Sequence, residues 1–269
     1  MERVTPDVPQ LRAMKVRGEK IAMLTAYDYP MARLLDEAGV DVLLVGDSVG
    51  MVVLGYPDTT LVTMDEMAHH TRAVARGATR ALILADLPYR SYETPEQAVA
   101  NAQRLIEAGA QAVKLEGGTA RVPQIQALAA AGIPAMAHIG MMPQNVRIEG
   151  GYRLKGKTPE QADALLADAR AVEAAGAFGI LVELVVPEVA QRITASVEIP
   201  TIGIGAGTGC DGQVLVLHDL VGLFPWFTPK FATPRANVAE EIRKAVASYL
   251  SATKIQALSL AAILATWLP

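Results

Sequence analysis

The sequence predicts a (β/α)8 barrel, and three observations support this fold. Short apolar runs alternate with longer stretches of helical period along the chain. The runs carry few polar residues, which is typical of parallel strands covered on both faces. An Ala-Gly pair recurs where predicted helices give way to strands, at Ala38-Gly39, Ala108-Gly109, Ala131-Gly132 and Ala175-Gly176. This repeated unit favours a closed barrel over an open doubly wound sheet.

The elements follow in order along the chain. The predicted strands are Ile21–Thr25, Val42–Gly46, Ala81–Ala85, Ala112–Leu115, Pro134–His138, Gly179–Val182, Pro200–Ile204 and Gln213–Val216. The predicted helices are Pro30–Ala38, Met64–Arg76, Pro95–Ala108, Val122–Ala131, Pro159–Ala175, Pro187–Ser196 and Arg235–Ser251. Thr94-Pro95 and Thr158-Pro159 each offer a capping threonine followed by proline, the usual start of a helix. The connection between the last two strands is too short for an ordinary helix.

The 269 residues are expected to form one domain, because α/β barrels of this length fold as single units. Residues 1–19 are expected to add an N-terminal cap to the barrel. Residues 252–269 are expected to form an apolar C-terminal helix that packs on a neighbouring subunit.

Composition excludes several classes of protein. The net charge of −4 and the 5% of aromatic residues give no basic or stacking surface for nucleic acid. Cys210 is the single cysteine, so no intrachain disulfide can form and a reducing cytoplasm is expected. The first twenty residues lack the apolar core of a secretory signal. The apolar tail Ile255–Leu268 is shorter than the roughly 18 residues that span a bilayer, so no membrane association is expected.

Three carboxylates stand at the ends of consecutive predicted strands: Asp47, Asp86 and Glu116. Barrel enzymes build their active sites at the carboxyl ends of the strands, so we expect these side chains to meet at one mouth. Hard oxygen ligands suit Mg²⁺, which also accepts substrate oxygens, and a 2-oxo acid could chelate it there. The alternative is that one or more of these acids cap helices or pair with arginines.

Three further residues follow the same pattern. Lys114 lies two positions before Glu116 and therefore points to the same face, where it would stabilise an anionic oxygen or form a structural ion pair. His138 ends the fifth strand and is either a core residue or part of the site. Glu183 lies among apolar residues, where a raised pKa would suit a proton acceptor, unless an arginine neutralises it.

Gly203-Ile204-Gly205-Ala206-Gly207 follows the seventh strand. A phosphate could bind there, as it does near the last strands of many barrels. The dinucleotide fingerprint is incomplete, so a tight loop that requires small residues is the favoured interpretation.

The chain resembles the ketopantoate hydroxymethyltransferase family over nearly its whole length. The motifs that carry the resemblance are Leu24-Thr25-Ala26-Tyr27-Asp28, Val45-Gly46-Asp47-Ser48-Val49-Gly50-Met51, Ala85-Asp86-Leu87-Pro88, Val113-Lys114-Leu115-Glu116-Gly117-Gly118, Gly150-Gly151-Tyr152, Ile202-Gly203-Ile204-Gly205-Ala206-Gly207, Asp211-Gly212-Gln213-Val214-Leu215-Val216 and Pro229-Lys230-Phe231. Two segments depart from it. Met142 stands where the family motif His-Leu-Gly-Leu-Thr-Pro-Gln has threonine, and Leu184-Val185-Val186-Pro187 replaces Cys-Val-Pro.

The resemblance implies a barrel of the phosphoenolpyruvate/pyruvate superfamily with one Mg²⁺ per subunit, held by Asp47, Asp86 and Glu116. It implies that 3-methyl-2-oxobutanoate is bound by Asp47, Ser48, Asp86 and Lys114 with His138 beside it, and that Glu183 is the proton acceptor. It also implies 5,10-methylenetetrahydrofolate as the one-carbon donor and a homo-oligomer, often a decamer.

The mechanistic hypothesis is that a Mg²⁺-bound enolate attacks the folate methylene carbon, giving 2-dehydropantoate for pantothenate biosynthesis. Two alternatives remain at this point. The first is a C–C lyase or mutase of the same superfamily, which would carry a reactive cysteine or extra phosphate-binding residues in a loop. The second is a catalytically silent barrel that only binds a metal or ligand, for which 2-oxo acid binding without proton exchange at C3 would be diagnostic.

Overall fold

The computed structural model describes residues 7–265, and side chains only up to residue 254. The chain divides into two compact units, with the boundary between Leu217 and His218. The first unit is the barrel, and it contains every residue that the sequence assigns to the site.

Eight parallel strands close into a barrel in sequence order, with β1 pairing to both β2 and β8. The predicted (β/α)8 barrel is therefore confirmed, and each predicted strand lies within two residues of the observed one at either end. The strands are β1 (Ile21–Thr25), β2 (Val42–Val45), β3 (Leu82–Asp86), β4 (Ala112–Glu116), β5 (Ala135–Gly140), β6 (Gly179–Glu183), β7 (Thr201–Ile204) and β8 (Gly212–Leu215).

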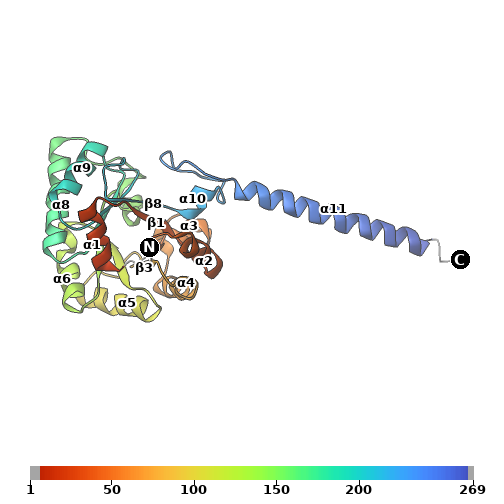
Figure 1. Ribbon diagram of the computed structural model, residues 1–269, viewed down its shortest axis with the longest axis horizontal. Coiled ribbons are helices and arrows are strands. Elements are labelled where there is room, and N and C mark those ends of the chain that lie inside the picture. The colour runs from red at the N-terminus through yellow and green to blue at the C-terminus, as the bar shows by residue number, and fades with distance from the viewer. Residues whose placement is uncertain (1–6, 266–269) are drawn as a thin grey trace. The chain divides into compact units, whose positions relative to one another are not determined.

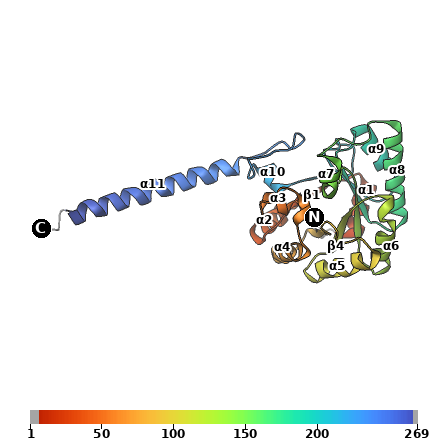
Figure 2. The same ribbon diagram turned by 180° about the vertical axis from the view of Figure 1, so that it is seen from behind.

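Helices surround the strands on the outside of the barrel, as the views from opposite sides show (Figures 1 and 2). The side chains of Thr94 and Thr158 accept hydrogen bonds from the backbone of the first turns, so both predicted caps are observed. The helices of this layer are α2 (Tyr29–Ala38), α4 (Met64–Gly77), α5 (Pro95–Glu107), α6 (Val122–Ala130), α8 (Pro159–Ala174) and α9 (Pro187–Ser196).

Short helices in the loops at the carboxyl ends of the strands were not predicted from the sequence. Each has at most four residues, too few to give a hydrophobic period. They are α3 (Val49–Val52), η1 (Thr59–Leu61), η2 (Thr119–Arg121), η3 (Pro143–Asn145) and α7 (Val146–Glu149).

The loop between β7 and β8 contains no helix, as its length predicts. A side chain at Gly207, whose φ is +74°, would lie 2.7 Å from the ring of Pro187. This close packing supports the interpretation of Gly203–Gly207 as a tight loop that requires small residues.

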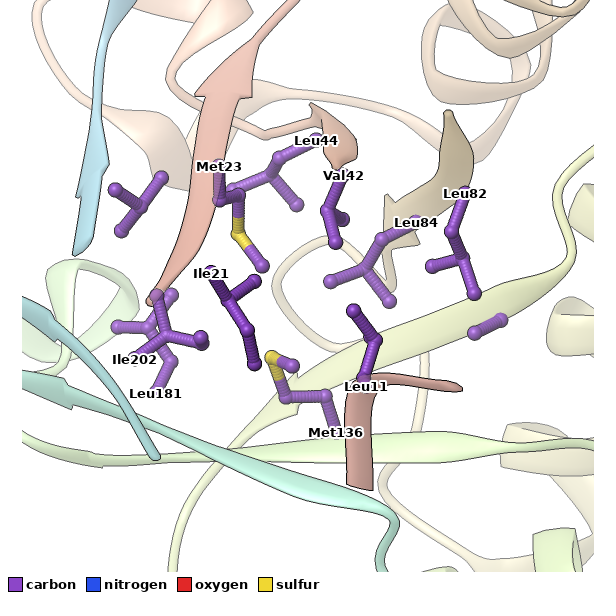
Figure 3. Close-up of a cluster of buried hydrophobic side chains, with 12 residues drawn as sticks. Leu11, Ile21, Met23, Val42, Leu44, Leu82, Leu84, Met136, Leu181 and Ile202 are labelled. Atoms are coloured by element: carbon purple, nitrogen blue, oxygen red, sulfur yellow. The ribbon is translucent and has the colours of Figure 1, made fainter. Parts of the chain in front are cut away.

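The amino-terminal half of the barrel interior is apolar (Figure 3). Inward side chains such as Ile21, Val42 and Leu82 come from the first positions of their strands. Leu11, from helix α1 (Val8–Arg17), packs among them with 1% of its surface exposed. The predicted cap region thus contributes a side chain to the barrel core, which leaves the carboxyl-terminal half for polar residues.

The second unit contains α10 (Leu217–Val221), which begins at the unit boundary, and α11 (Val238–Ala265). One continuous helix, α11, covers most of the predicted helix 235–251 and of the apolar segment 252–269, whose last residues, 266–269, lie outside the described range. Within residues 7–265, no helix combines the length and apolar character needed to cross a membrane.

Candidate active site

Six of the predicted site residues lie buried at the carboxyl ends of β2 to β6. Asp86, Glu116 and Glu183 are the last residues of their strands. Lys114 shares the inward face of β4 with Glu116, as the two-residue period of a strand requires. None is more than 8% exposed, and the set is Asp47, Asp86, Lys114, Glu116, His138 and Glu183.

Lys114 and His138 connect the charged groups. Nζ of Lys114 lies 3.2 Å from Oδ1 of Asp86 and 3.3 Å from Nδ1 of His138. The same imidazole nitrogen lies 3.5 Å from Oε1 of Glu116, and Nε2 lies 3.2 Å from Oε2 of Glu183. The structure therefore brings five predicted residues from four strands into one cluster.

One oxygen of each candidate metal-binding carboxylate is held by a hydrogen bond. The backbone amide of Asp47 donates to Oδ2 of Asp86 at 3.0 Å. Nε2 of Gln144 donates to Oδ2 of Asp47 at 2.9 Å, and the backbone amide of Gln144 donates to Oε2 of Glu116 at 3.0 Å. The other oxygen of Glu116 is buried and accepts no hydrogen bond, whereas the other oxygen of Asp86 faces Nζ of Lys114.

These carboxylates fit a hard divalent cation. Buried carboxylate oxygens without hydrogen bonds are costly in a protein unless a cation compensates them, and oxygen is the donor atom that Mg²⁺ prefers. Within the described residues, however, no three histidine, cysteine, aspartate or glutamate side chains are already arranged as a metal-binding group. The donor atoms are present, although the side chains as placed form no such group of three.

Burial changes the acidity of the cluster. It raises the pKa of Glu183 to about 8, and burial with the charge of Asp86 raises the pKa of Asp47 to about 7. Burial and the charge of Lys114 lower the pKa of His138 well below its ordinary value. Burial alone would lower the pKa of Lys114, but attraction by its carboxylate neighbours outweighs this and raises it. At neutral pH the cluster therefore holds a cationic lysine and a neutral histidine.

Ser48 is placed differently from the other predicted residues. It follows Asp47, and its hydroxyl lies 2.8 Å from the hydroxyl of Tyr27. Tyr27 is buried, which raises the pKa of its phenol. Ser48 is thus fixed beside the cluster, half-buried.

Sequence reasoning missed the roles of Gln144 and Tyr92. Gln144 lies in η3, and Tyr92 lies in the loop between β3 and α5. The hydroxyl of Tyr92 donates to Oε1 of Gln144 and accepts from the backbone amide of Glu116 at 3.3 Å. Neither residue lies on a predicted element, and the only available signal for Gln144 was its place in a motif.

A cavity of about 270 Å³ borders the cluster, because Glu116 and Gln144 are part of its wall. Tyr89, Tyr92 and Arg121 also line it. The guanidinium of Arg121 lies over the Tyr92 ring, 5.0 Å from the ring centroid, and forms no ion pair within the described part of the chain. The cavity therefore offers aromatic surface and a positive charge next to the carboxylates.

Comparison with known proteins gives the family. The model of the ketopantoate hydroxymethyltransferase family matches residues 5–258. The chain belongs to this family. A relative from Syntrophus aciditrophicus, a 3-methyl-2-oxobutanoate hydroxymethyltransferase, is 54% identical over 94% of this chain and 93% of its own length. The relative of the same name from Moorella thermoacetica is 55% identical over 92% of this chain and 93% of its own length.

Solved structures of more distant proteins share the fold of this ketopantoate hydroxymethyltransferase family member. Phosphoenolpyruvate phosphomutase from Streptomyces platensis aligns with a TM-score of 0.64 at 18% identity, over 93% of this chain and 88% of that one. Phosphonopyruvate hydrolase, solved with oxalate and Mg²⁺, aligns with a TM-score of 0.60 at 16% identity, over 78% and 80% of the two chains. At these identities the likeness concerns the barrel alone.

One departure from the ketopantoate hydroxymethyltransferase motif has a structural counterpart. Leu184, in the segment that replaces Cys-Val-Pro, has a φ of +47°, in the left-handed region that leucine seldom adopts. Its carbonyl accepts from the amide of Lys155 at 2.7 Å, and its amide donates to the carbonyl of Ile204 at 2.9 Å. These bonds hold the backbone directly after Glu183, so the strained turn fixes the end of β6.

Proposed function

We propose that the protein transfers a one-carbon unit from 5,10-methylenetetrahydrofolate to 3-methyl-2-oxobutanoate. The methylene carbon of the donor becomes bonded to C3 of the oxo acid, water supplies the hydroxyl, and the products are 2-dehydropantoate and tetrahydrofolate. This reaction belongs to pantothenate biosynthesis. The observation that carries the proposal is the buried cluster at the strand ends. In it, Lys114 contacts Asp86 and His138, and His138 in turn contacts Glu183.

Asp47, Asp86 and Glu116 would hold the divalent metal, Mg²⁺, one per subunit. When bound, the metal would polarise the keto group and make the neighbouring C3–H more acidic. Two observations support Mg²⁺: the hard oxygen donors of these residues, and the buried Oε1 of Glu116, which accepts no hydrogen bond.

The side chains around the oxo acid have separate roles in this proposal. Glu183 removes the C3 proton, because its raised pKa makes it an effective proton acceptor near neutral pH. Lys114 stabilises the negative oxygen that develops on proton loss, since its neighbours keep it charged. Ser48 contacts the carboxylate of the substrate, Asp47 and Asp86 help to bind the oxo acid, and His138 lies beside it.

The one-carbon donor enters through the cavity beside Glu116 in this proposal. Folates carry flat rings and carboxylates, and the cavity presents the rings of Tyr89 and Tyr92 with the guanidinium of Arg121. The donor would then approach the oxo acid from the side of β4 and β5. We further propose a cytoplasmic homo-oligomer, a decamer, in which the apolar helix after Ser251 packs on a neighbouring subunit.

The experiment that tests the function measures proton removal from the oxo acid and transfer of the one-carbon unit separately. Exchange of the C3 proton of 3-methyl-2-oxobutanoate into D₂O, followed by NMR without donor, should require Mg²⁺. Formation of 2-dehydropantoate should require both Mg²⁺ and 5,10-methylenetetrahydrofolate. Exchange without product formation would contradict the assignment of the donor, and an absence of exchange would contradict the whole proposal.

A further inference from the structure

We propose that Gln144 is a positioning residue, which orients Asp47 and Glu116 toward the metal ion. This inference rests on the proposed function, because it concerns the cation that those carboxylates would hold. Gln144 is 4% exposed and lies in η3, outside the strands that carry the carboxylates. Gln144 contacts Asp47 through its side-chain amide and Glu116 through its backbone amide.

The side-chain amide of Gln144 can adopt only one orientation. Nε2 donates to Oδ2 of Asp47 at 2.9 Å and to the carbonyl oxygen of Leu87 at 3.0 Å. Oε1 accepts from the hydroxyl of Tyr92. A flipped amide would direct its oxygen at two acceptors, so the bonds to Asp47 and Leu87 select the observed state, and the Tyr92 hydroxyl is free to donate to Oε1.

The backbone of Gln144 holds the second carboxylate. Its amide donates to Oε2 of Glu116 at 3.0 Å, and the amide of Glu116 in turn donates to the Tyr92 hydroxyl at 3.3 Å. Gln144, Tyr92 and Glu116 therefore form a closed ring of hydrogen bonds. Because Oε2 is fixed, Oε1 of Glu116 is the oxygen left for a cation.

The chemistry of an amide suits this position. Lys114, a cation, lies 3.2 Å from Asp86 and offsets its charge. The neutral amide of Gln144 instead fixes Asp47 in place and brings no positive charge that would compete with a divalent ion. Groups that orient metal ligands by hydrogen bonds typically change metal affinity by about 10-fold to 100-fold when removed.

Mn²⁺ binding tests the inference without turnover. Full-length protein is titrated with Mn²⁺ alone, and the free ion is followed by electron paramagnetic resonance. Gln144→Met keeps the side-chain length and the backbone amide but removes the bonds to Asp47, and it should raise the Mn²⁺ dissociation constant about tenfold or more. Tyr92→Phe removes the hydroxyl that orients this amide and accepts from the amide of Glu116, and it should raise the dissociation constant by a smaller factor.

Gln124 provides the matched control. It is 5% exposed, and its amide donates to the carbonyl oxygens of Tyr92 and Glu93 and to no carboxylate. Gln124→Met should lower the melting temperature and leave the Mn²⁺ dissociation constant unchanged. Melting curves show which variants are folded at the titration temperature, and Tyr92→Phe carries the test if Gln144→Met does not fold.

The outcomes are distinct. Unchanged Mn²⁺ affinity in folded Gln144→Met would overturn the inference, and so would an equal loss in Gln124→Met, because general destabilisation would then explain both. In those cases wild-type binding and C3 exchange would still support the proposed function. A wild-type protein that binds no Mn²⁺ and exchanges no C3 proton would overturn both.

Discussion

Nε2 of His138 lies 3.2 Å from Oε2 of Glu183, so neighbouring strands β5 and β6 bring a neutral base and a protonated acid together. Burial lowers the pKa of His138 well below its ordinary value and raises the pKa of Glu183 to about 8. At neutral pH the proton of the pair therefore belongs to Glu183. As the proposed base, Glu183 would have to lose this proton before it could accept one from the substrate.

Glu183→Gln should abolish proton removal while preserving shape. We expect C3 exchange of 3-methyl-2-oxobutanoate to fall by about 10²-fold to 10⁴-fold, the usual contribution of a general base. Proton NMR in D₂O measures the rate. Glu188→Gln, an exposed carboxyl in the first turn of α9, should exchange at the wild-type rate. Wild-type exchange in Glu183→Gln would show that another group is the base.

Stability without divalent cations should fall as the pH rises. The folded pKa values of Asp47, about 7, and Glu183, about 8, exceed the ordinary 3.8 and 4.5. The folded protein then binds more protons than the unfolded chain, and the free energy of unfolding decreases between about pH 4 and pH 8. Urea titrations in EDTA across this window measure the slope. Glu183→Gln should reduce it, and an equal slope in that variant would contradict the assignment.

Lys114→Met should destabilise the protein in a pH-dependent way. Removing one partner of a buried ion pair costs about 3–5 kcal/mol, because the other charge is left uncompensated. The loss should be largest near pH 8 and smaller near pH 5, where the neighbouring carboxyl groups with raised pKa take up protons. Thermal melts at both pH values provide the comparison, with the exposed Lys157→Met as control. A loss that is the same at both pH values would argue against carboxylate repulsion.

Arg121→Ala should weaken donor binding and spare the oxo acid. Loss of a charge-assisted hydrogen bond, about 1.5–3 kcal/mol, corresponds to a rise of roughly tenfold or more in the KM for 5,10-methylenetetrahydrofolate. C3 exchange needs no donor and should change little. Steady-state kinetics with each substrate varied separates the two effects, and Arg170→Ala, an exposed change on α8, serves as control. An unchanged donor KM would exclude Arg121 from the donor site.

Leu11→Ala should show that α1 stabilises the barrel from its amino-terminal end. Removing this 1% exposed side chain should cost about 2–5 kcal/mol, as for other buried leucines. Val16→Ala on the same helix, where valine is 81% exposed, should change stability by less than about 0.5 kcal/mol. Urea unfolding of both variants makes the comparison. Equal effects would mean that Leu11 does not contribute to the core.

The sequence predicts the strands and the strand-end residues because both follow from simple periods. A strand buried on both faces is a run of apolar residues. The charged side chains of Asp86 and Glu116 are therefore easily recognised at the ends of β3 and β4. The pairing of Lys114 with Glu116 on one face follows from the alternation of side chains. The expected raised pKa of Glu183 is also found, and within the described residues its neighbour is His138, with no arginine in contact.

The roles of Gln144 and Tyr92 could not be predicted from such periods, for a physical reason. They are hydrogen-bonded across 52 positions of sequence, and both lie in segments without regular period. Their partners are set by how the loops after β3 and β5 meet, which depends on the closed barrel. The same applies to Leu184, whose left-handed backbone is held by bonds to Lys155 and Ile204.

The inward face of β4 changes from Ala112, in the apolar core, to Lys114 and then Glu116 within a single strand. Two residues of a strand advance by only about 6.6 Å. A slip of β4 by one residue would turn Val113 and Leu115 into the mouth and both charges toward the surrounding helices. Activity of this protein therefore depends on the correct register of β4. Compact molecules with a shifted β4 would keep their helix content, but an assay of C3 exchange would show that they are inactive.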